Sequence, residues 1–295
     1  MREADVFSYA EFTTRNIGFV TPAEQERLRA AGVLVVGVGG MGGAALQALA
    51  RTGVGRFAIA DIDEFEVSNF NRQVFADLDS VGRSKAEATA ARLRRIHPDI
   101  ALEVYGSDWP GHLDDLLQRY PVVVNGMDDI AAGIDLYRRA RASDATVIDA
   151  YASPLPSVYV VGPEDPRPEE RLGYPSVGRL PAGLNAEQRG ACFAREIEHV
   201  MVHSSSIRYI DMEAAAELVA GKRKRMSFAP MVITTGNLMA FEAVKLLLGR
   251  KPTADCRGYF FNPWSMTIER PKPWLLAAPR RLIARRFLSR LMHGR

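Results

Sequence analysis

Residues 35–73 read VVGVGGMGGAALQALARTGVGRFAIADIDEFEVSNFNRQ, and they decide the fold class of this chain. A β-branched run typical of a buried strand leads through a glycine-rich turn into an alanine-rich helix. The turn is shaped by Gly37, Gly39, Gly40 and Gly42. Glycines let such a turn close and let backbone N–H groups approach a phosphate at the positive end of the helix. A second strand ends at Asp61, where a carboxylate can accept hydrogen bonds from ribose hydroxyls, so the stretch predicts a nucleotide site.

The composition suits a folded protein and excludes several kinds of site. The chain has 295 residues, 47% of them hydrophobic, and a net charge of +3 that offers no argument for binding nucleic acid. Two cysteines, Cys192 and Cys256, are too few for a disulfide framework or a four-cysteine zinc site. The first residues lack the apolar core of a secretory signal, so we expect a cytoplasmic protein. Residues 30–50 carry no charge, but their six glycines favour a strand, turn and buried helix over a membrane span.

Strand-like and helix-like segments alternate along the first half of the chain. Strands are expected at 32–37, 56–61, 100–105, 122–125 and 146–149. Helices are expected at 41–51, 85–96, 113–119 and 132–142. This alternation predicts an α/β fold, Rossmann-like and doubly wound around a mostly parallel sheet.

The second half of the chain is more varied. Residues 162–190 are rich in Pro, Gly and Arg without periodicity, which predicts an irregular insertion, whereas 230–249 predicts a helix and 259–269 a final strand. We therefore expect five segments: an N-terminal helical segment (1–30), a nucleotide-binding α/β domain (31–160), an irregular insertion or crossover region (161–227), the closing helix and strand of the α/β domain (228–272), and a basic amphipathic tail (273–295).

The tail has six arginines and no acidic residue between positions 279 and 295. Its apolar residues share one helical face: Leu282, Ile283, Phe287, Leu288 and Leu291. Such a helix suits peripheral contact with an anionic membrane surface or an acidic protein groove, and packing on its own domain is the alternative. Pro271, Pro273 and Pro279 favour a separately attached segment.

The polar cluster that follows Asp61 points away from a simple dinucleotide site. A nucleoside triphosphate carries more negative charge than a dinucleotide, and its chemistry needs cations around the leaving pyrophosphate. Arg72 and Lys85 can supply them, with Asn69 and Gln73 as polar partners. Taken singly, each cation reads as an ordinary surface or helix residue; taken together after one strand, they favour a triphosphate.

These motifs resemble the ThiF/MoeB superfamily, whose members adenylate a carboxylate and include the ubiquitin-activating enzymes. The similarity lies in these matching segments: the glycine turn at 37–42, LARTGVG at 49–55, DID at 61–63, SNFNRQ at 68–73, GRSK at 82–85, NGMD at 125–128, TRNIG at 14–18 and GNLMAFEAVKLLLG at 236–249. SNFNRQ after DID is the most discriminating of them.

The resemblance implies a role for each matched position. Gly39 and Gly40 would lie under the phosphates, with Gly37 and Gly42 completing the turn. Asp61 would hold the ribose, and Asp63 and Gln73 would complete the ATP site. The triphosphate would be surrounded by Asn69, Arg72 and Lys85. Asp128 would hold Mg²⁺, and Arg15 would reach the γ-phosphate, in homodimeric members from the neighbouring subunit. The catalytic set implied is thus Arg15, Arg72, Lys85 and Asp128.

Three departures from the family pattern bear on function. Asp128-Asp129 replaces the usual Asp-Asn and adds a carboxylate beside the metal position. The paired CxxC motifs of the sulfur-carrier branch are absent from the sequence. Where many relatives place a catalytic cysteine loop, this chain has only Cys192, which we interpret as a small buried helix residue; thioester transfer stays open.

The sequence thus predicts a homodimeric, ATP- and Mg²⁺-dependent adenylyltransferase. Its carboxylate would be the C-terminal glycine of a ubiquitin-like or sulfur-carrier protein, or a peptide or small acid. The alternatives are a nicotinamide- or flavin-dependent oxidoreductase that uses the same glycine turn, and a non-catalytic scaffold of the same fold.

Overall fold

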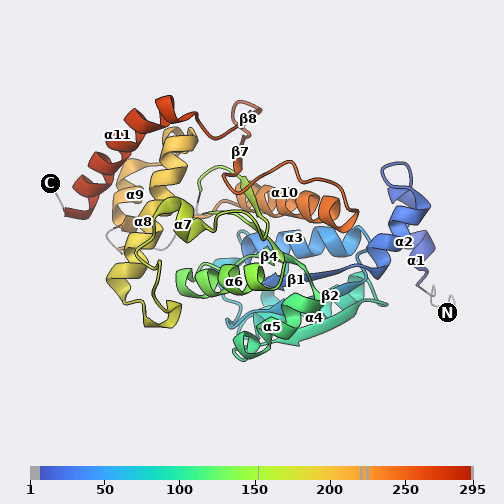
Figure 1. Cartoon of the computed structure of the whole chain (residues 1–295). Helices are drawn as coiled ribbons and strands as arrows, with labels where there is room; N and C mark the ends of the chain where they lie inside the picture. The colour runs from blue at the N-terminus through green and yellow to red at the C-terminus, as the bar shows by residue number, and fades with distance from the viewer. Residues whose placement is uncertain (1–6, 152, 220–221, 224–225, 294–295) are drawn as a thin grey trace.

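The computed structural model describes the chain except residues 1–6, 152, 220–221, 224–225 and 294–295 (Figure 1). In this described part, one eight-stranded sheet has the order β3-β2-β1-β4-β5-β6-β7-β8. The strands are β1 (Gly32–Val36), β2 (Arg56–Ala60), β3 (Ala101–Tyr105), β4 (Val122–Asn125), β5 (Thr146–Asp149), β6 (Ser157–Val161), β7 (Tyr259–Asn262) and β8 (Thr267–Glu269). The first five are parallel and the last three antiparallel, which confirms the predicted doubly wound, mostly parallel sheet.

Helices cover both faces of the sheet because its strands are apolar on both sides. One face packs on α2 (Pro22–Ala30), α3 (Gly40–Arg51), α4 (Lys85–Ile96) and α10 (Ala229–Leu247). The other face packs on α5 (Trp109–Arg119) and α6 (Ile130–Ala142). The short α1 (Tyr9–Thr13) and the 3-10 turn η1 (Thr14–Asn16) precede α2. Along β1, Val33 and Val35 face one layer while Leu34 and Val36 face the other, so sequence alternation sets the layering.

The insertion is more helical than the sequence predicted. It contains α7 (Pro168–Leu172), α8 (Ala186–His203) and α9 (Met212–Val219), with the 3-10 turns η4 (Pro181–Gly183) and η5 (Ser206–Tyr209). The expectation of an irregular segment was wrong for α8, which Asn185 starts with a reciprocal capping box to Gln188. The interpretation of Cys192 as a buried helix residue is confirmed, but the full extent of α8 was missed, because residues 162–190 show no helical periodicity.

The predicted final strand at 259–269 is a hairpin of β7 and β8. Asn262 reverses the chain by accepting hydrogen bonds from the backbone N–H groups of Trp264 and Ser265. Met266 then adopts a positive φ of 54°. The single-strand prediction was wrong because a side chain, rather than a glycine, closes this turn.

The basic tail forms α11 (Trp274–His293), which runs through Pro279 and packs on α8 (Figure 1). Among the residues of α11 whose burial is described, Ala277, Ala284 and Leu288 are buried, whereas Leu282 and Ile283 are exposed, so the predicted apolar face was wrong for these two. The side chain of Leu291 lies outside the described residues. Contact with a membrane surface stays a prediction. No helix in the described part of the chain combines the length and apolar character that crossing a bilayer requires.

Charged groups attach α11 to α8. The Arg280 guanidinium donates to the carbonyls of Met201 and Ser204, groups that the end of α8 would otherwise leave without partners. The buried carboxylate of Glu198 pairs with Arg281 and Arg285 of α11. The tail is therefore part of the folded unit, and the expectation from Pro279 of a break in regular structure was wrong.

We expect Gly42→Ala to destabilise the fold because its Cβ would lie 1.9 Å from the carbonyl oxygen of Gly37. The loss in the free energy of unfolding should be at least about 2 kcal/mol, since backbone rather than a flexible side chain must yield. Gly111→Ala in α5 is the control: its Cβ meets no atom within 4 Å, and it should stabilise by up to about 1 kcal/mol. Urea unfolding measures both, and equal losses would contradict the packing argument.

Candidate functional site

The glycine turn lies where β1 ends and α3 begins. Gly37 has a φ of +85°, and Gly126, in the loop after β4, approaches so closely that a Cβ on it would lie 2.3 Å from the Gly37 carbonyl oxygen. Gly39 is the N-cap residue of α3 and lines a cavity together with Gly40. The first turn of a twelve-residue helix thus presents its N–H groups and positive dipole end to that cavity.

Asp61 joins the turn to the end of β2. Its Oδ2 accepts a hydrogen bond of 2.8 Å from the N–H of Val38, and its Oδ1 accepts one of 3.0 Å from the N–H of Asp63. Burial raises the pKa of the Asp61 carboxyl, and these bonds and nearby Lys85 oppose that rise. Each carboxylate oxygen has a second lone pair, so Asp61 can still accept from a ribose hydroxyl.

Lys85 lies at the start of α4 and reaches across to Asp63. Its Nζ is 2.8 Å from the Oδ2 of Asp63, and its backbone N–H donates to the Asp63 carbonyl. The Lys85 side chain is 9% exposed and that of Asp63 is 63% exposed. The pair lines the cavity, so Asp63 places the ammonium group beside the nucleotide position.

The SNFNRQ segment forms the compact loop that follows. Asn69 is buried and accepts from the Glu66 N–H, which makes it a residue that shapes the loop; it does not line the cavity. Arg72 lines the cavity and donates through Nη1 to the Ser68 carbonyl and the Asn71 side chain. Gln73 is buried beside Gly39, and its Oε1 accepts no hydrogen bond in the described structure. A ligand donor would satisfy this buried acceptor.

The loop after β4 carries the two adjacent aspartates. Asp128 is exposed and lines the cavity. Asp129 has other partners: its Oδ1 accepts from the Ala132 N–H as the N-cap of α6, and its Oδ2 lies 3.2 Å from Arg189 of α8. Asp129 therefore caps the start of α6 and pairs with Arg189 of the insertion. These two structural roles account for the second aspartate without assigning it to a metal ion.

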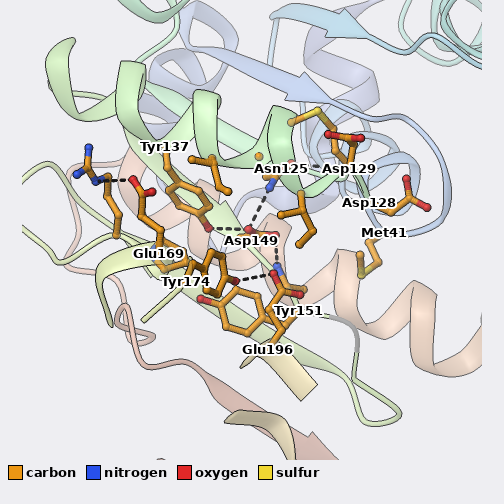
Figure 2. A pocket seen from close by; sticks show the side chains of 17 residues that line it. Met41, Asn125, Asp128, Asp129, Tyr137, Asp149, Tyr151, Glu169, Tyr174 and Glu196 are labelled. Carbon is orange, nitrogen blue, oxygen red and sulfur yellow. Dashed lines mark hydrogen bonds and ion pairs between the residues drawn. The ribbon is translucent and has the colours of Figure 1, made fainter. Parts of the chain in front are cut away.

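A buried network supports this loop from beneath (Figure 2). Asp149, at the end of β5, accepts from Tyr137 Oη at 2.5 Å and from Asn125 Nδ2 at 3.0 Å. Asn125 Oδ1 in turn accepts from the Met127 N–H. Burial raises the pKa of Asp149 to about 6 despite these donors. A small polar cavity of about 60 Å³ lies here, lined by Asp128, Asp149 and the Tyr174–Glu196 pair among others.

These groups meet at a larger cavity of about 480 Å³ along the carboxyl ends of the parallel strands. From the predicted set, it is lined by Gly37, Gly39, Gly40, Asp61, Asp63, Arg72, Gln73, Lys85 and Asp128. Ligands of doubly wound folds bind at this edge of the sheet. The sequence did not predict the lining residues that come from the insertion and α11, among them Phe193 and Phe287, nor core residues such as Trp109 and Val232.

Arg15 lies away from this cavity. It belongs to η1, whose Asn16 donates to the carbonyl of Thr52 at the far end of α3. A helix of twelve residues is about 18 Å long, so η1 is roughly that far from the glycine turn of its own chain. A role for Arg15 therefore requires a second subunit, and it stays a prediction.

The cavity fits a nucleoside triphosphate with a divalent cation. A helix N-terminus, two cations and the orphan amide oxygen of Gln73 suit phosphates and a ribose or base donor. In the described part of the chain, no group of three His, Cys, Asp or Glu residues forms a metal cage. Mg²⁺ usually takes one or two carboxylates plus substrate phosphates, so Asp128 alone suits that pattern.

Cys192 is buried in α8 and packs with Ile134, Tyr174 and Leu184. Burial raises the pKa of its thiol, which keeps it protonated at neutral pH. The interpretation of Cys192 as a structural residue fits this environment.

A model of the ThiF family matches residues 13–279. The chain belongs to the ThiF family. A sulfur carrier protein adenylyltransferase from Thermus thermophilus is 39% identical over 115 residues, covering 37% of this chain and 41% of that protein. A tRNA threonylcarbamoyladenosine dehydratase from Haemophilus influenzae is 32% identical over 131 residues, covering 43% of this chain and 50% of that protein.

Solved structures agree with this ThiF-family fold. A crystal structure of E. coli MccB with ATP has a TM-score of 0.60 and 17% identity, covering 84% of this chain and 65% of that one. At that identity the likeness shows the fold alone. The matched curated relatives are covered over half their length or less. The name adenylyltransferase recurs among them and supports the predicted enzyme class.

We expect Asp149→Asn to reduce the pH dependence of stability of this ThiF-family protein. With a pKa of about 6 against an ordinary 3.8, Asp149 keeps a proton in the folded state that the unfolded chain has released. The free energy of unfolding should therefore fall as pH rises through this window, by up to about 3 kcal/mol from this group. Urea unfolding from pH 4 to 7 measures the slope, with the exposed Asp79→Asn as control. An unchanged slope in Asp149→Asn would contradict the assignment.

Proposed function

We propose that the protein uses ATP and Mg²⁺ to adenylate a carboxylate, releasing pyrophosphate. The observation that carries the proposal is that Arg72, Lys85 and Asp128 line one cavity with the glycine turn. A nicotinamide or flavin site does not need this charge arrangement, and family membership also argues against the oxidoreductase alternative. A scaffold without catalysis has no use for a half-buried arginine and a buried lysine at the turn.

The chemistry needs no side-chain nucleophile. A carboxylate oxygen of the substrate forms a bond to the α-phosphorus, and the bond from that phosphorus to the bridging oxygen breaks. The positive end of α3, Arg72 and Lys85 would stabilise the charge that develops on the phosphates. Asp61 would orient the ribose, and Asp128 would hold Mg²⁺, which neutralises the phosphates when bound. The protein thus contributes positioning and preorganised charge.

The names of the relatives suggest one class of carboxylate substrate for this protein, and a second class stays open. The Thermus relative is named for a sulfur carrier protein, which makes a carrier C-terminus one candidate here. A peptide or small acid is the other. We also propose a homodimer in which Arg15 of one subunit approaches the cavity of the other.

We expect Arg72→Ala to lower ATP–pyrophosphate exchange by about 10²–10³-fold, because one preorganised donor to the transition state is lost. Lys85→Met should act similarly while keeping the buried volume. The control is Arg83→Ala, which removes a nearby exposed cation that does not line the cavity. Exchange of labelled pyrophosphate into ATP with a panel of carboxylates is the measurement. Normal exchange in either cavity variant, with the fold intact by circular dichroism, would refute the triphosphate assignment.

Mixing two inactive chains tests the shared site. Arg15→Ala and Asp128→Ala each remove one half of a shared site, so a hybrid dimer would hold one intact site. After subunit exchange, activity should return to about a quarter of the wild-type level for an isologous dimer. Each variant incubated with itself is the control. If mass spectrometry shows hybrids and activity stays absent, Arg15 does not act across the interface.

A further inference from the structure

The 480 Å³ cavity has two chemically different halves. Its charged lining residues all precede position 130: Asp61, Asp63, Arg72, Lys85, Asp128 and Asp129. Among the described residues that line it after position 130, none is charged. We call the apolar chamber the part lined by Phe193, Ile197, Val200, Met201, Ile207, Ile210, Ala215, Leu218, Met226, Phe287 and Leu288.

Strand order places the chamber on the side away from the nucleotide base. Along the sheet edge, Trp109 follows β3, Asp61 follows β2, the glycine turn follows β1, and Asp128 follows β4. With phosphates at the turn and ribose at Asp61, the base continues toward Trp109. The chamber lies on the opposite side, where Tyr151 follows β5 and where α8, which contacts α6, contributes Phe193 and Ile197 to the lining. A group in the chamber therefore reaches the phosphates from the side of Asp128.

The chamber walls are ordered by contacts made outside it. Phe193, Ile197, Val200 and Met201 recur at helical spacing on one face of α8, while Glu198 leaves another face to pair with α11. The Arg280 bonds to the end of α8 hold α11 where Phe287 and Leu288 close the far wall. The helices α8 and α11 lie side by side (Figure 1), and side chains from both line this half of the cavity.

Three polar side chains that line the same cavity after position 130, those of Tyr151, Ser153 and Ser206, already have partners. Ser206 Oγ lies 3.3 Å from Ser153 Oγ, and Ser153 Oγ accepts from the Leu155 N–H. Tyr151 Oη accepts from Arg171 at 2.9 Å. An extended peptide would bring N–H and C=O groups that these side chains do not satisfy, at a cost in free energy. An apolar chain gains by leaving water.

We infer that the apolar chamber selects the substrate, and that the substrate is a small carboxylic acid with an apolar chain. Its carboxylate would lie between Asp128 and the glycine turn, and its chain would fill the chamber. This inference rests on the proposed adenylation and adds the class of acid that is activated.

The inference is tested by measuring exchange of labelled pyrophosphate into ATP in the presence of carboxylic acids of increasing chain length. The probes are acetate, butyrate, hexanoate and octanoate, with suberate as the equally long dicarboxylate and a synthetic peptide ending in Gly-Gly. We expect kcat/KM to rise roughly fourfold per added methylene and suberate to fall about 100-fold below octanoate. Higher activity with suberate or the peptide than with octanoate would overturn the inference while leaving adenylation standing. Absence of exchange with every probe would count against the proposed function instead.

A matched pair of variants on α11 links the selectivity to the chamber. Phe287→Asp puts a charge into the lining and should lower kcat/KM for octanoate about 10- to 100-fold, with the KM for ATP unchanged. Ile283→Asp puts the same charge on the same helix at a 68% exposed position and should change neither value. Equal losses in both variants would overturn the role of the chamber.

Two further measurements keep the test decisive. Phe287→Ala enlarges the chamber and should shift the preferred acid from octanoate toward decanoate, which a merely damaged fold would not do. Calorimetric titration of octanoate into the full chain, with a non-hydrolysable ATP analogue present, reports binding without turnover. Binding that is weakened by Phe287→Asp and kept by Ile283→Asp supports the chamber even if exchange fails. Absence of binding to the wild-type chain would overturn it.

Discussion

The site depends on the backbone contact among three glycines, Gly37, Gly42 and Gly126. At these positions a Cβ would lie within 3 Å of facing backbone atoms, so the turn after β1 and the loop after β4 touch directly. This contact brings the first turn of α3 beside Asp128 and makes one cavity from the ends of adjacent parallel strands. The Asp61 carboxylate, which accepts a hydrogen bond from the Val38 N–H, then holds the turn from the β2 side. The positions of the turn, of Asp61 and of the loop that carries Asp128 follow from this arrangement.

Ion pairs and buried polar groups determine which charges remain for a ligand. Asp63 holds the Lys85 ammonium group at the cavity, while Asp129 is engaged by α6 and Arg189. The buried Asp149 supports the loop of Asp128 through Asn125. Asp63 and Asp129 are thus paired with cations, whereas no ion pair engages Asp128 among the described residues. The result is a cavity lined by a helix N-terminus, two cations and an exposed Asp128 carboxylate.

The insertion and the tail extend this site with a different chemistry. Both contribute apolar side chains to the cavity and neither contributes a charged one among the described lining residues. Buried Glu198 and the arginines of α11 hold these elements together outside the cavity, where partial exposure to water lowers the cost of charge. The charged half of the cavity is the side that we propose for ATP, and the helices of the insertion and the tail line the side on which an acid would be recognised.

Local sequence determined the parallel sheet, the helix over 85–96 and most of the charged half of the cavity, because strand periodicity, glycine spacing and short-range motifs between residues 32 and 149 specify them. Asn69 was assigned to the ligand by its motif, yet the structure uses it inside a turn. The hairpin after Asn262 and the continuous α11 through Pro279 were missed, since each depends on one side-chain contact or on packing against α8. The apolar chamber required the tertiary structure, because no sequence motif specifies how α8 and α11 pack, and both charged pairs and apolar contacts between them bring their side chains to one cavity.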